Sequence, residues 1–294
     1  MFNNNISILA IQEPTSAERT FTKGETTSIQ KHCDKWEVIP QISQYQIILI
    51  SKHIMAYHRL EETYMDGRVI LNIFQIDHEE EMNLISTYGI PHSFHKSTSA
   101  TDAQNKKRIN LTNALDQILK NKTETRKTHP LTYVHGDLQD TPDNSKLFHY
   151  GKCRMPKQAH GIIKTCEKYN MECIIYKFVH QMPHPIISRH GTAGGRFIDG
   201  CYTTTSGIDK VIALAILTSD AVGISSDHDM VLFKLDLGIM PHTVAKEYQE
   251  KIDYNSVVNI PMNIKKGEVH PTLNQSTFKG TNFEHQAKLY HKLQ

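Results

Sequence analysis

The sequence predicts an α/β protein, built from layers of strands and helices rather than from a helical bundle. Apolar or β-branched runs of strand length recur from the N-terminus to Leu237, and helical spacing of apolar residues appears between them. No internal repeat with a period of about 20 to 50 residues is visible. The expected strands are Ile6–Ile11, Ile47–Ile50, Val69–Ile76, Leu84–Tyr88, Leu131–His135, Cys173–Val179, Phe197–Thr203 and Met230–Leu237.

Two helices are expected between these strands. Apolar residues fall near helical spacing within the polar stretch Asn105–Lys122. They do so more clearly in Ala159–Tyr169, which follows Pro156, a residue that suits the first turn of a helix. After Leu237 the composition becomes polar, with few apolar clusters. We therefore expect one folded domain over residues 1–240 and a polar extension or linker over residues 241–294.

Length and composition exclude several classes of protein. With 294 residues, 38% hydrophobic and 22% charged, the chain can bury a sizeable core, so it is neither a disordered tail nor a disulfide knot. The formal net charge of +2 gives no global field, so an anionic partner must be bound locally. The five cysteines are odd in number and form no C-x-x-C, which favours a reducing compartment over a disulfide framework.

Neither a membrane segment nor a zinc site is expected. The longest apolar run, Val211–Leu217, is far shorter than the roughly 20 residues that span a bilayer, and no signal peptide is visible. We therefore expect an intracellular protein, cytoplasmic or nuclear, that is not secreted and has no membrane partner. His180, His184 and His190 could be grouped as metal ligands, but intervening prolines break any helix that would align them.

Two expected strands end in side chains that could do chemistry. The first strand continues into Gln12 and Glu13, although a carboxylate at a strand end is usually just exposed to solvent. The strand over Leu131–His135 continues into Gly136, which allows a tight exit, and Asp137 and Gln139 would then emerge on one side.

Two later segments add an acid and an imidazole. A strand that follows the pair Gly194 and Gly195 would present Asp199, while Asp227 and His228 stand side by side before the last strand. Carboxylate oxygens suit Mg²⁺, which neutralises charge on a phosphate while a second carboxylate aligns a water and a histidine binds a non-bridging oxygen. This set is typical of phosphate-ester hydrolysis, although a single Asp–His pair could equally be a satisfied core pair.

Taken in order, these segments resemble the endonuclease/exonuclease/phosphatase family of the DNase I and exonuclease III type. That family carries Gln-Glu, Tyr-x-Pro, Gly-Asp-x-Asn, Arg-x-x-Asp and Ser-Asp-His at successive strand ends. The corresponding segments here are Gln12–Glu13, Tyr88–Pro91, Gly136–Gln139, Arg196–Asp199 and Ser226–His228. Each motif alone is common, but all five occur in the family's order across residues 6 to 237.

The resemblance implies a DNase I-like, four-layer α/β/β/α sandwich with two mixed β-sheets. Two departures bear on activity. The family usually opens with a strand that ends in a metal-binding Asn, and only eleven residues precede Gln12, so we expect this N-terminal strand to be missing. Gln139 stands in the position of the family's Asn, and a displacement of its amide by roughly 1 Å can cost about a hundredfold in rate.

The resemblance also implies roles for the metal and the water. Glu13 would ligate Mg²⁺ or Mn²⁺, and Asp227 would lie at or near that ion. Asp137 would orient or deprotonate the attacking water. Gln139 would help to hold the water and the phosphate.

On the phosphate, the resemblance implies that Asp199 pairs with His228, which contacts the scissile group. Tyr88 would donate its hydroxyl to a phosphate oxygen, although a tyrosine considered alone is more often a core or rim residue. Arg196 is assigned to structure rather than to chemistry.

Loops rather than the core decide the substrate in such a fold, so the phosphodiester is inferred from weaker features. The basic stretches Lys106–Arg108 and Lys120–Lys127 could follow a DNA backbone, although such runs are also typical of a solvated helix face. The polar extension resembles the connector between endonuclease and reverse transcriptase in non-LTR retrotransposons. We expect a Mg²⁺-dependent, DNA-nicking domain of retroelement type, with DNA and a reverse transcriptase encoded downstream as partners. The alternatives are an inactive remnant that acts as a binding module and a small-molecule phosphoesterase.

Overall fold

The computed structural model describes residues 6–14, 20–35, 37–76, 80–91, 98–123, 130–140, 161–182, 186–190, 195–222 and 226–238. A compact unit ends at Leu237. Several predictions fall outside the described residues: those on His184, on Gly194, on the end of the second basic stretch at 124–127, on the helix start at 159–160 and on the extension over 241–294.

A six-stranded mixed sheet forms the centre of the fold, with strand order β4-β5-β6-β7-β9-β8. Its strands are β4 (His58–Tyr64), β5 (Val69–Gln75), β6 (Glu81–Thr87), β7 (Leu131–Asp137), β8 (Glu172–Cys173) and β9 (Asp199–Thr203). Only β6 and β7 run parallel. A parallel pair needs a crossover connection, and helix α2 (Thr98–Thr123) lies between these two strands in the sequence, as the periodicity predicts.

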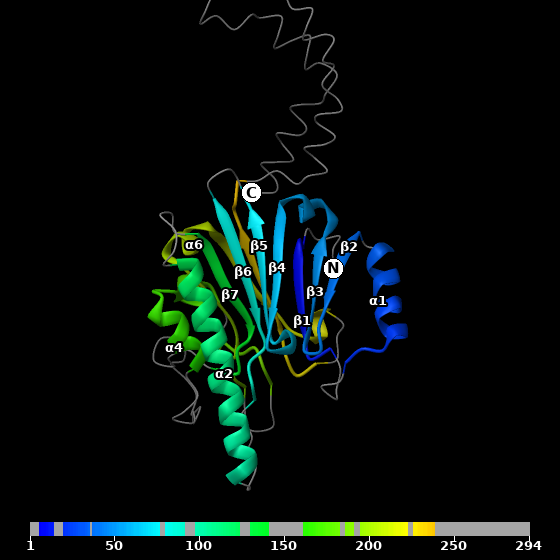
Figure 1. Cartoon of the computed structure of the whole chain (residues 1–294). Coiled ribbons are helices and arrows are strands. Elements are labelled where there is room, and N and C mark those ends of the chain that lie inside the picture. Colours follow the sequence, from blue (N-terminus) through cyan, green and yellow to red (C-terminus); the bar gives the residue numbers. More distant parts are fainter. Residues whose placement is uncertain are drawn as a thin grey trace, which may run out of the picture. The chain divides into compact units, whose positions relative to one another are not determined.

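Helices α2 and α4 (Gly161–Lys168) cover one face of this sheet (Figure 1). The buried residues of α2 recur at helical spacing, as in Leu111, Leu115 and Ile118, and they pack in one apolar cluster with alternate residues of the strands. This packing explains why a helix with a mostly polar sequence is stable there.

The opposite face of the central sheet packs against two antiparallel sheets. One has the order β1-β3-β2 and the other contains β10 and β11. Their strands are β1 (Ile8–Gln12), β2 (Val38–Ile42), β3 (Gln46–Ser51), β10 (Val211–Leu217) and β11 (Met230–Leu235). Gln46 of β3 accepts a hydrogen bond from Ser86, and Phe233 of β11 stacks on Tyr133, so both sheets contact the same face.

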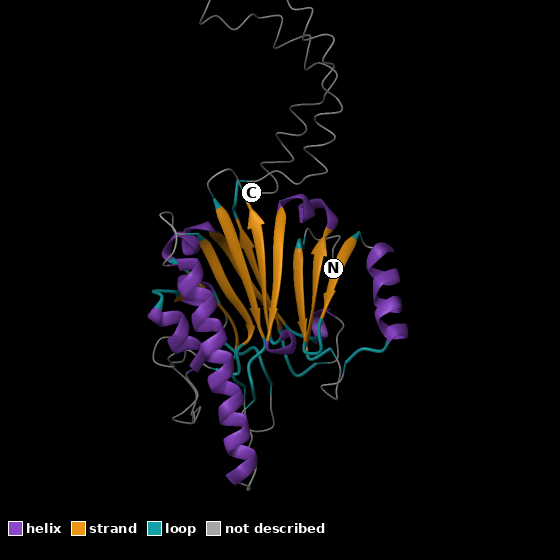
Figure 2. Ribbon diagram, in the orientation of Figure 1, coloured by secondary structure: helices purple, strands orange, loops and turns teal. Residues whose placement is uncertain are grey.

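Helix α1 (Lys23–Lys35) forms the outer layer on β2 and buries Cys33 (Figures 1 and 2). The order of layers is therefore helix, sheet, sheet, helix, which confirms the predicted α/β/β/α sandwich. The central sheet is mixed as predicted, whereas the described strands of the second sheet layer pair only antiparallel. No helix in the described part of the chain is both long and apolar enough to cross a membrane.

One predicted strand, Cys173–Val179, is wrong over most of its length. Pairing with β9 ends at Cys173, and the chain turns into α5 (Ile175–Phe178). Ile174, Ile175 and Phe178 are all buried. A short apolar run buried on all sides does not distinguish a strand from a helical turn, which is why the sequence misleads here. The remaining short elements are η2 (Lys52–Tyr57), η3 (Met65–Gly67), η4 (Val179–Gln181), α6 (Thr205–Lys210) and η5 (Asp220–Val222).

Candidate active site

Strand ends carry the predicted site residues to one edge of the sheets. Asp137 is the last residue of β7 and Asp199 is the first of β9, and the antiparallel register pairs them directly. Glu13 follows β1, and Tyr88 follows β6. The Tyr88 hydroxyl donates a hydrogen bond to Glu13, which joins the ends of two strands from opposite sheets.

The side chain of Gln12 joins the end of β1 to the ends of β6 and β7. Its Nε2 donates to the carbonyl oxygen of Thr87 at 3.0 Å, and its Oε1 accepts from the amide of Asp137. Gly136 makes room for this side chain and has φ +133°, in a region that disfavours other residues. A Cβ at Gly136 would lie 2.3 Å from both Gln12 Nε2 and Thr87 O. The sequence points to Gly136 and Gln12, but not to their contact.

Asp137 is buried at the base of the site, with 2% of its surface exposed. The Gln139 amide N–H donates to its Oδ1 at 3.0 Å, and Gln139 Nε2 donates to its Oδ2 at 2.6 Å. Burial and the negative charge of Asp199 raise the pKa of Asp137 to about 7. The carboxylate is therefore held in one orientation, with a pKa close to neutral pH.

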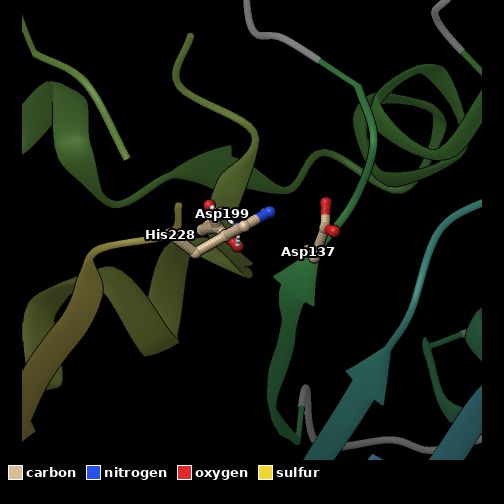
Figure 3. Close-up of side chains that lie close together, drawn as sticks. All are labelled: Asp137, Asp199 and His228. Carbon is tan, nitrogen blue, oxygen red and sulfur yellow. Dashed lines mark hydrogen bonds and ion pairs between the residues drawn. The ribbon is translucent and has the colours of Figure 1, made fainter. Parts of the chain in front are cut away.

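Asp199 and His228 form the second half of the site (Figure 3). His228 Nδ1 lies 2.9 Å from Asp199 Oδ2 and 3.0 Å from Oδ1. Burial lowers the pKa of His228, but the hydrogen bond and the charge of Asp199 outweigh it and raise the pKa to about 9. The imidazole is thus charged at neutral pH, so Nδ1 donates to Asp199 and the second ring nitrogen remains a donor.

Glu13 and Tyr88 occupy the side of the site next to Asp137. Tyr88 is 1% exposed, and burial together with its bond to Glu13 raises the pKa of its hydroxyl well above the usual range. The phenol therefore stays protonated and serves as a donor. In this structure it donates to Glu13, whereas the sequence assigned it to a phosphate oxygen.

The site is rich in hard oxygen donors, as a divalent cation requires. Asp137, Asp199 and His228 each offer one ligand atom, all within 4.8 Å of one another. Burial and, after it, the negative charge of Asp199 raise the pKa of Asp137, and a bound cation would favour the charged form of this carboxylate. The predicted ligands Glu13 and Asp227 do not belong to this group of three, so their role as ligands stays a prediction. Asp227 is 56% exposed and lies with its Oδ1 3.9 Å from His228 Nε2.

A short ladder behind the site contains residues that sequence reasoning missed. The segment with Ser188 and Arg189 pairs with the segment around His228 through backbone contacts. The buried Ser188 hydroxyl accepts from the amides of Ile198 and Asp199, both at 3.0 Å, and its carbonyl accepts from Asp229 at 2.7 Å. No motif marks these residues, because their contacts form between separate segments of the chain once it is folded.

The same ladder accounts for one of the grouped histidines. His190 Nε2 lies 2.8 Å from Oδ2 of the buried Asp229. Among the described residues, neither His190 nor His180 belongs to a group with metal-ligand spacing.

Comparisons with known proteins identify the fold. No protein-family model and no curated protein matches this sequence. A 3'-5' exonuclease from Neisseria meningitidis is 12% identical, with a TM-score of 0.58 over 78% of this chain and 89% of its own. An AP endonuclease from Archaeoglobus fulgidus is 14% identical, with a TM-score of 0.57 over 80% of this chain and 91% of its own. An AP endonuclease from Leishmania major is 13% identical, with a TM-score of 0.58 over 80% of each chain.

At these identities the likeness concerns the fold alone. The chain has the DNase I-like α/β fold. In particular, it is the fold of the endonuclease/exonuclease/phosphatase proteins that the five ordered motifs predict.

Proposed function

We propose that this chain is a metal-dependent phosphodiesterase that nicks DNA. The observation that carries the proposal is the meeting of Asp137, Asp199 and His228 at the strand ends of a DNase I-like fold. A carboxylate with a pKa of about 7 is a base of suitable strength near neutral pH. An imidazolium held by a carboxylate is a suitable partner for phosphate charge.

The chemical step follows from these two halves. A water molecule hydrogen-bonded to Asp137 would attack the phosphorus, with its proton passing to the carboxylate. The bond from phosphorus to the leaving oxygen would break, and that oxygen would keep the electron pair and take up a proton from solvent to become a hydroxyl group. Gln139, which donates to both Asp137 oxygens, holds this carboxylate in one orientation. His228 would donate through Nε2 to a non-bridging oxygen, while Asp199 keeps the ring charged and oriented.

The carboxylates around this centre would hold the cation, with Glu13 and Asp227 as the proposed ligands. We propose Mg²⁺ or Mn²⁺, because the donors are oxygens and the described site includes no thiolate. When bound, the ion would supply charge neutralisation on the phosphate.

DNA is the proposed substrate because similar structures act on it. Two of the matched proteins are AP endonucleases, and a 3' phosphatase from Neisseria bound to a product DNA hairpin matches with a TM-score of 0.55 at 11% identity. In this chain, Lys106 and Lys107 are exposed on α2. Arg108 of the same run instead points inward and donates to the carbonyl of Ile90 at 3.1 Å, so we assign it to structure. The retroelement type and a downstream reverse transcriptase remain proposals that rest on the sequence.

Conversion of supercoiled plasmid to nicked circles tests the proposal. The purified chain should nick in Mg²⁺ or Mn²⁺ and stop in EDTA, and Asp137→Asn or His228→Gln should lower the rate at least about a hundredfold. Asp34→Asn, an exposed change on α1, is the matched control and should keep the wild-type rate. Circular dichroism confirms folding. A folded wild-type chain that leaves plasmid intact, while an AP endonuclease nicks it under the same conditions, contradicts the proposal.

One observation favours a second function, that of a binding module without turnover. Gln139 Nε2 lies 2.6 Å from Asp137 Oδ2, so the amide that should face water and phosphate is engaged with the base. If this contact blocks the reaction, Gln139→Asn should raise nicking by up to about a hundredfold. If the chain only binds, Gln139→Asn stays inactive, and a Mg²⁺ titration does not change in Glu13→Ala. Hydrolysis of a soluble phosphate ester without nicking would instead favour a small-molecule phosphoesterase.

A further inference from the structure

Arg189 lies beside the candidate site, although the reaction above gives it no part. Its backbone bridges to His228 in the ladder behind the site, and its Nε donates to Asp227 Oδ2 at 3.0 Å. The side chain is 39% exposed. It is therefore anchored at one nitrogen and open to solvent over part of its surface.

Asp227 places this guanidinium beside the proposed phosphate contact. Asp227 accepts from Arg189 Nε through Oδ2, and its Oδ1 lies 3.9 Å from His228 Nε2. His228 Nε2 is the ring nitrogen that is proposed to donate to a non-bridging phosphate oxygen. Arg189 therefore lies on the side of the site where the substrate phosphate is proposed to bind.

We propose that Arg189 binds a phosphate oxygen of the DNA strand on which the site acts. This inference rests on the proposed function and adds a substrate contact to it. A guanidinium presents five N–H donors in a planar fork, and Asp227 accepts from one of them. Among the described residues the two Nη nitrogens show no hydrogen-bond partner, so they can bind a phosphate in the bidentate manner that arginine favours.

A purely structural role for Arg189 makes different predictions. In that case the arginine would only neutralise Asp227. Both side chains of this pair are more than a third exposed, and ion pairs in such positions contribute little to stability. Removing Arg189 would then change neither the affinity for DNA nor its dependence on salt, whereas a phosphate contact must change both.

The experiment measures binding to a duplex oligonucleotide in EDTA over a series of salt concentrations. The slope of log K against log salt is negative, and the loss of one phosphate contact makes it shallower by about 0.9. Arg189→Ala should show this loss and should also lower kcat/KM for nicking about a hundredfold. Arg189→Lys should keep the slope, since it keeps the charge, but lose part of the rate. Arg59→Ala is the matched control, because Arg59 is exposed on β4, three strands away from β7, and it should leave slope and rate unchanged.

Asp227→Asn separates the two roles further. This variant breaks the ion pair but keeps Arg189, so the salt slope should be retained or become steeper. A wild-type slope in Arg189→Ala, with or without a lower melting temperature, overturns the inference, as does an equal loss of slope in Asp227→Asn and Arg189→Ala. A wild-type chain that does not nick, but whose salt slope falls in Arg189→Ala, refutes the proposed function and supports the DNA contact.

Discussion

The two faces of the central sheet are packed by different chemistry. The face toward α2 and α4 is apolar, and residues such as Leu71, Ile85 and Val134 are fully buried there against the helices. The face toward the other sheets contains buried amides and hydroxyls. Gln41 and Asn72 exchange two hydrogen bonds of 2.8 and 2.9 Å across it.

This polar face continues toward the candidate site. Ser86 donates to Gln46 at 2.7 Å, and Gln46 donates in turn to the carbonyl of Gly67 at 2.8 Å. Apolar contacts are non-directional, whereas hydrogen bonds depend on distance and angle and therefore restrict how two strands can align. The helical face therefore supplies stability, while the polar face fixes how the sheets align and so where Gln12 meets Asp137 and Glu13 meets Tyr88.

The largest effect is expected for Gly136→Ala on the polar face. The new Cβ would meet the Thr87 carbonyl and Gln12 at 2.3 Å, and the φ of +133° disfavours alanine. We expect a loss of about 4 kcal/mol in the free energy of unfolding by urea, together with loss of nicking. Gly24→Ala on α1 is the control, because no atom lies within 4 Å of its Cβ, and it should gain about 0.5 to 1 kcal/mol. A Gly136→Ala variant as stable as wild type would show that the close contact of Gln12 with Gly136 and Thr87 does not stabilise the fold.

A change on the apolar face should separate stability from activity. Leu115 is fully buried under α2, and Leu115→Ala should cost about 3 kcal/mol through lost burial and a cavity. Nicking per folded molecule should not change, because the site rests on the other face. Ile109→Ala on the same helix is the control; its side chain is 58% exposed, so the change should stay within about 0.5 kcal/mol. Loss of activity in folded Leu115→Ala would show that the apolar face also positions the site.

His135 makes the stability of the polar face depend on pH. Burial lowers the pKa of this histidine to about 4, below the value of about 6.5 expected in the unfolded chain. Between these pH values the His135 ring binds a proton in the unfolded chain but not in the folded one. The free energy of unfolding should therefore fall as the pH drops from about 6.5 to about 4, by at most about 3 kcal/mol. Urea unfolding at several pH values should show that His135→Asn loses this part of the dependence. The control His32→Asn, at an exposed position of α1, should keep it.

Local patterns predicted much of the fold, but only where an element buries a run or a periodic stripe of apolar side chains. The strands that became β5, β6 and β7 were evident because they are buried on both faces. Helix α1 was missed because Cys33 is its one buried residue among those described, which leaves no apolar periodicity. A weaker signal existed in the capping box, where Thr22 and Glu25 exchange hydrogen bonds at the helix start.

The same limit applies to the candidate site. Asp137, Asp199 and His228 could be predicted because each sits within a short motif at a strand end. The contributions of Ser188 and Arg189 could not, because they arise when residues 188–190 pair with two other segments, residues 196–199 and residues 227–229. Contacts of that kind depend on the assembled sheets, and no local pattern encodes them.

Ser188→Ala tests whether this ladder positions the site, and its expected effect is the smallest. The variant leaves the amides of Ile198 and Asp199 without their acceptor, at a cost of about 1 kcal/mol. Asp199 should then hold His228 less firmly, so the pKa of His228 should fall from about 9, and nicking at alkaline pH should decline earlier.

NMR titration of the His228 ring and the rate of nicking against pH measure both effects. Ser28→Ala, at an exposed position of α1, is the control and should change neither. A stability loss with an unchanged His228 titration would mean that Ser188 only fills the core. A lower pKa without a large stability loss would instead show that the polar contacts behind the site act on its charge, because the apolar face is untouched in this variant.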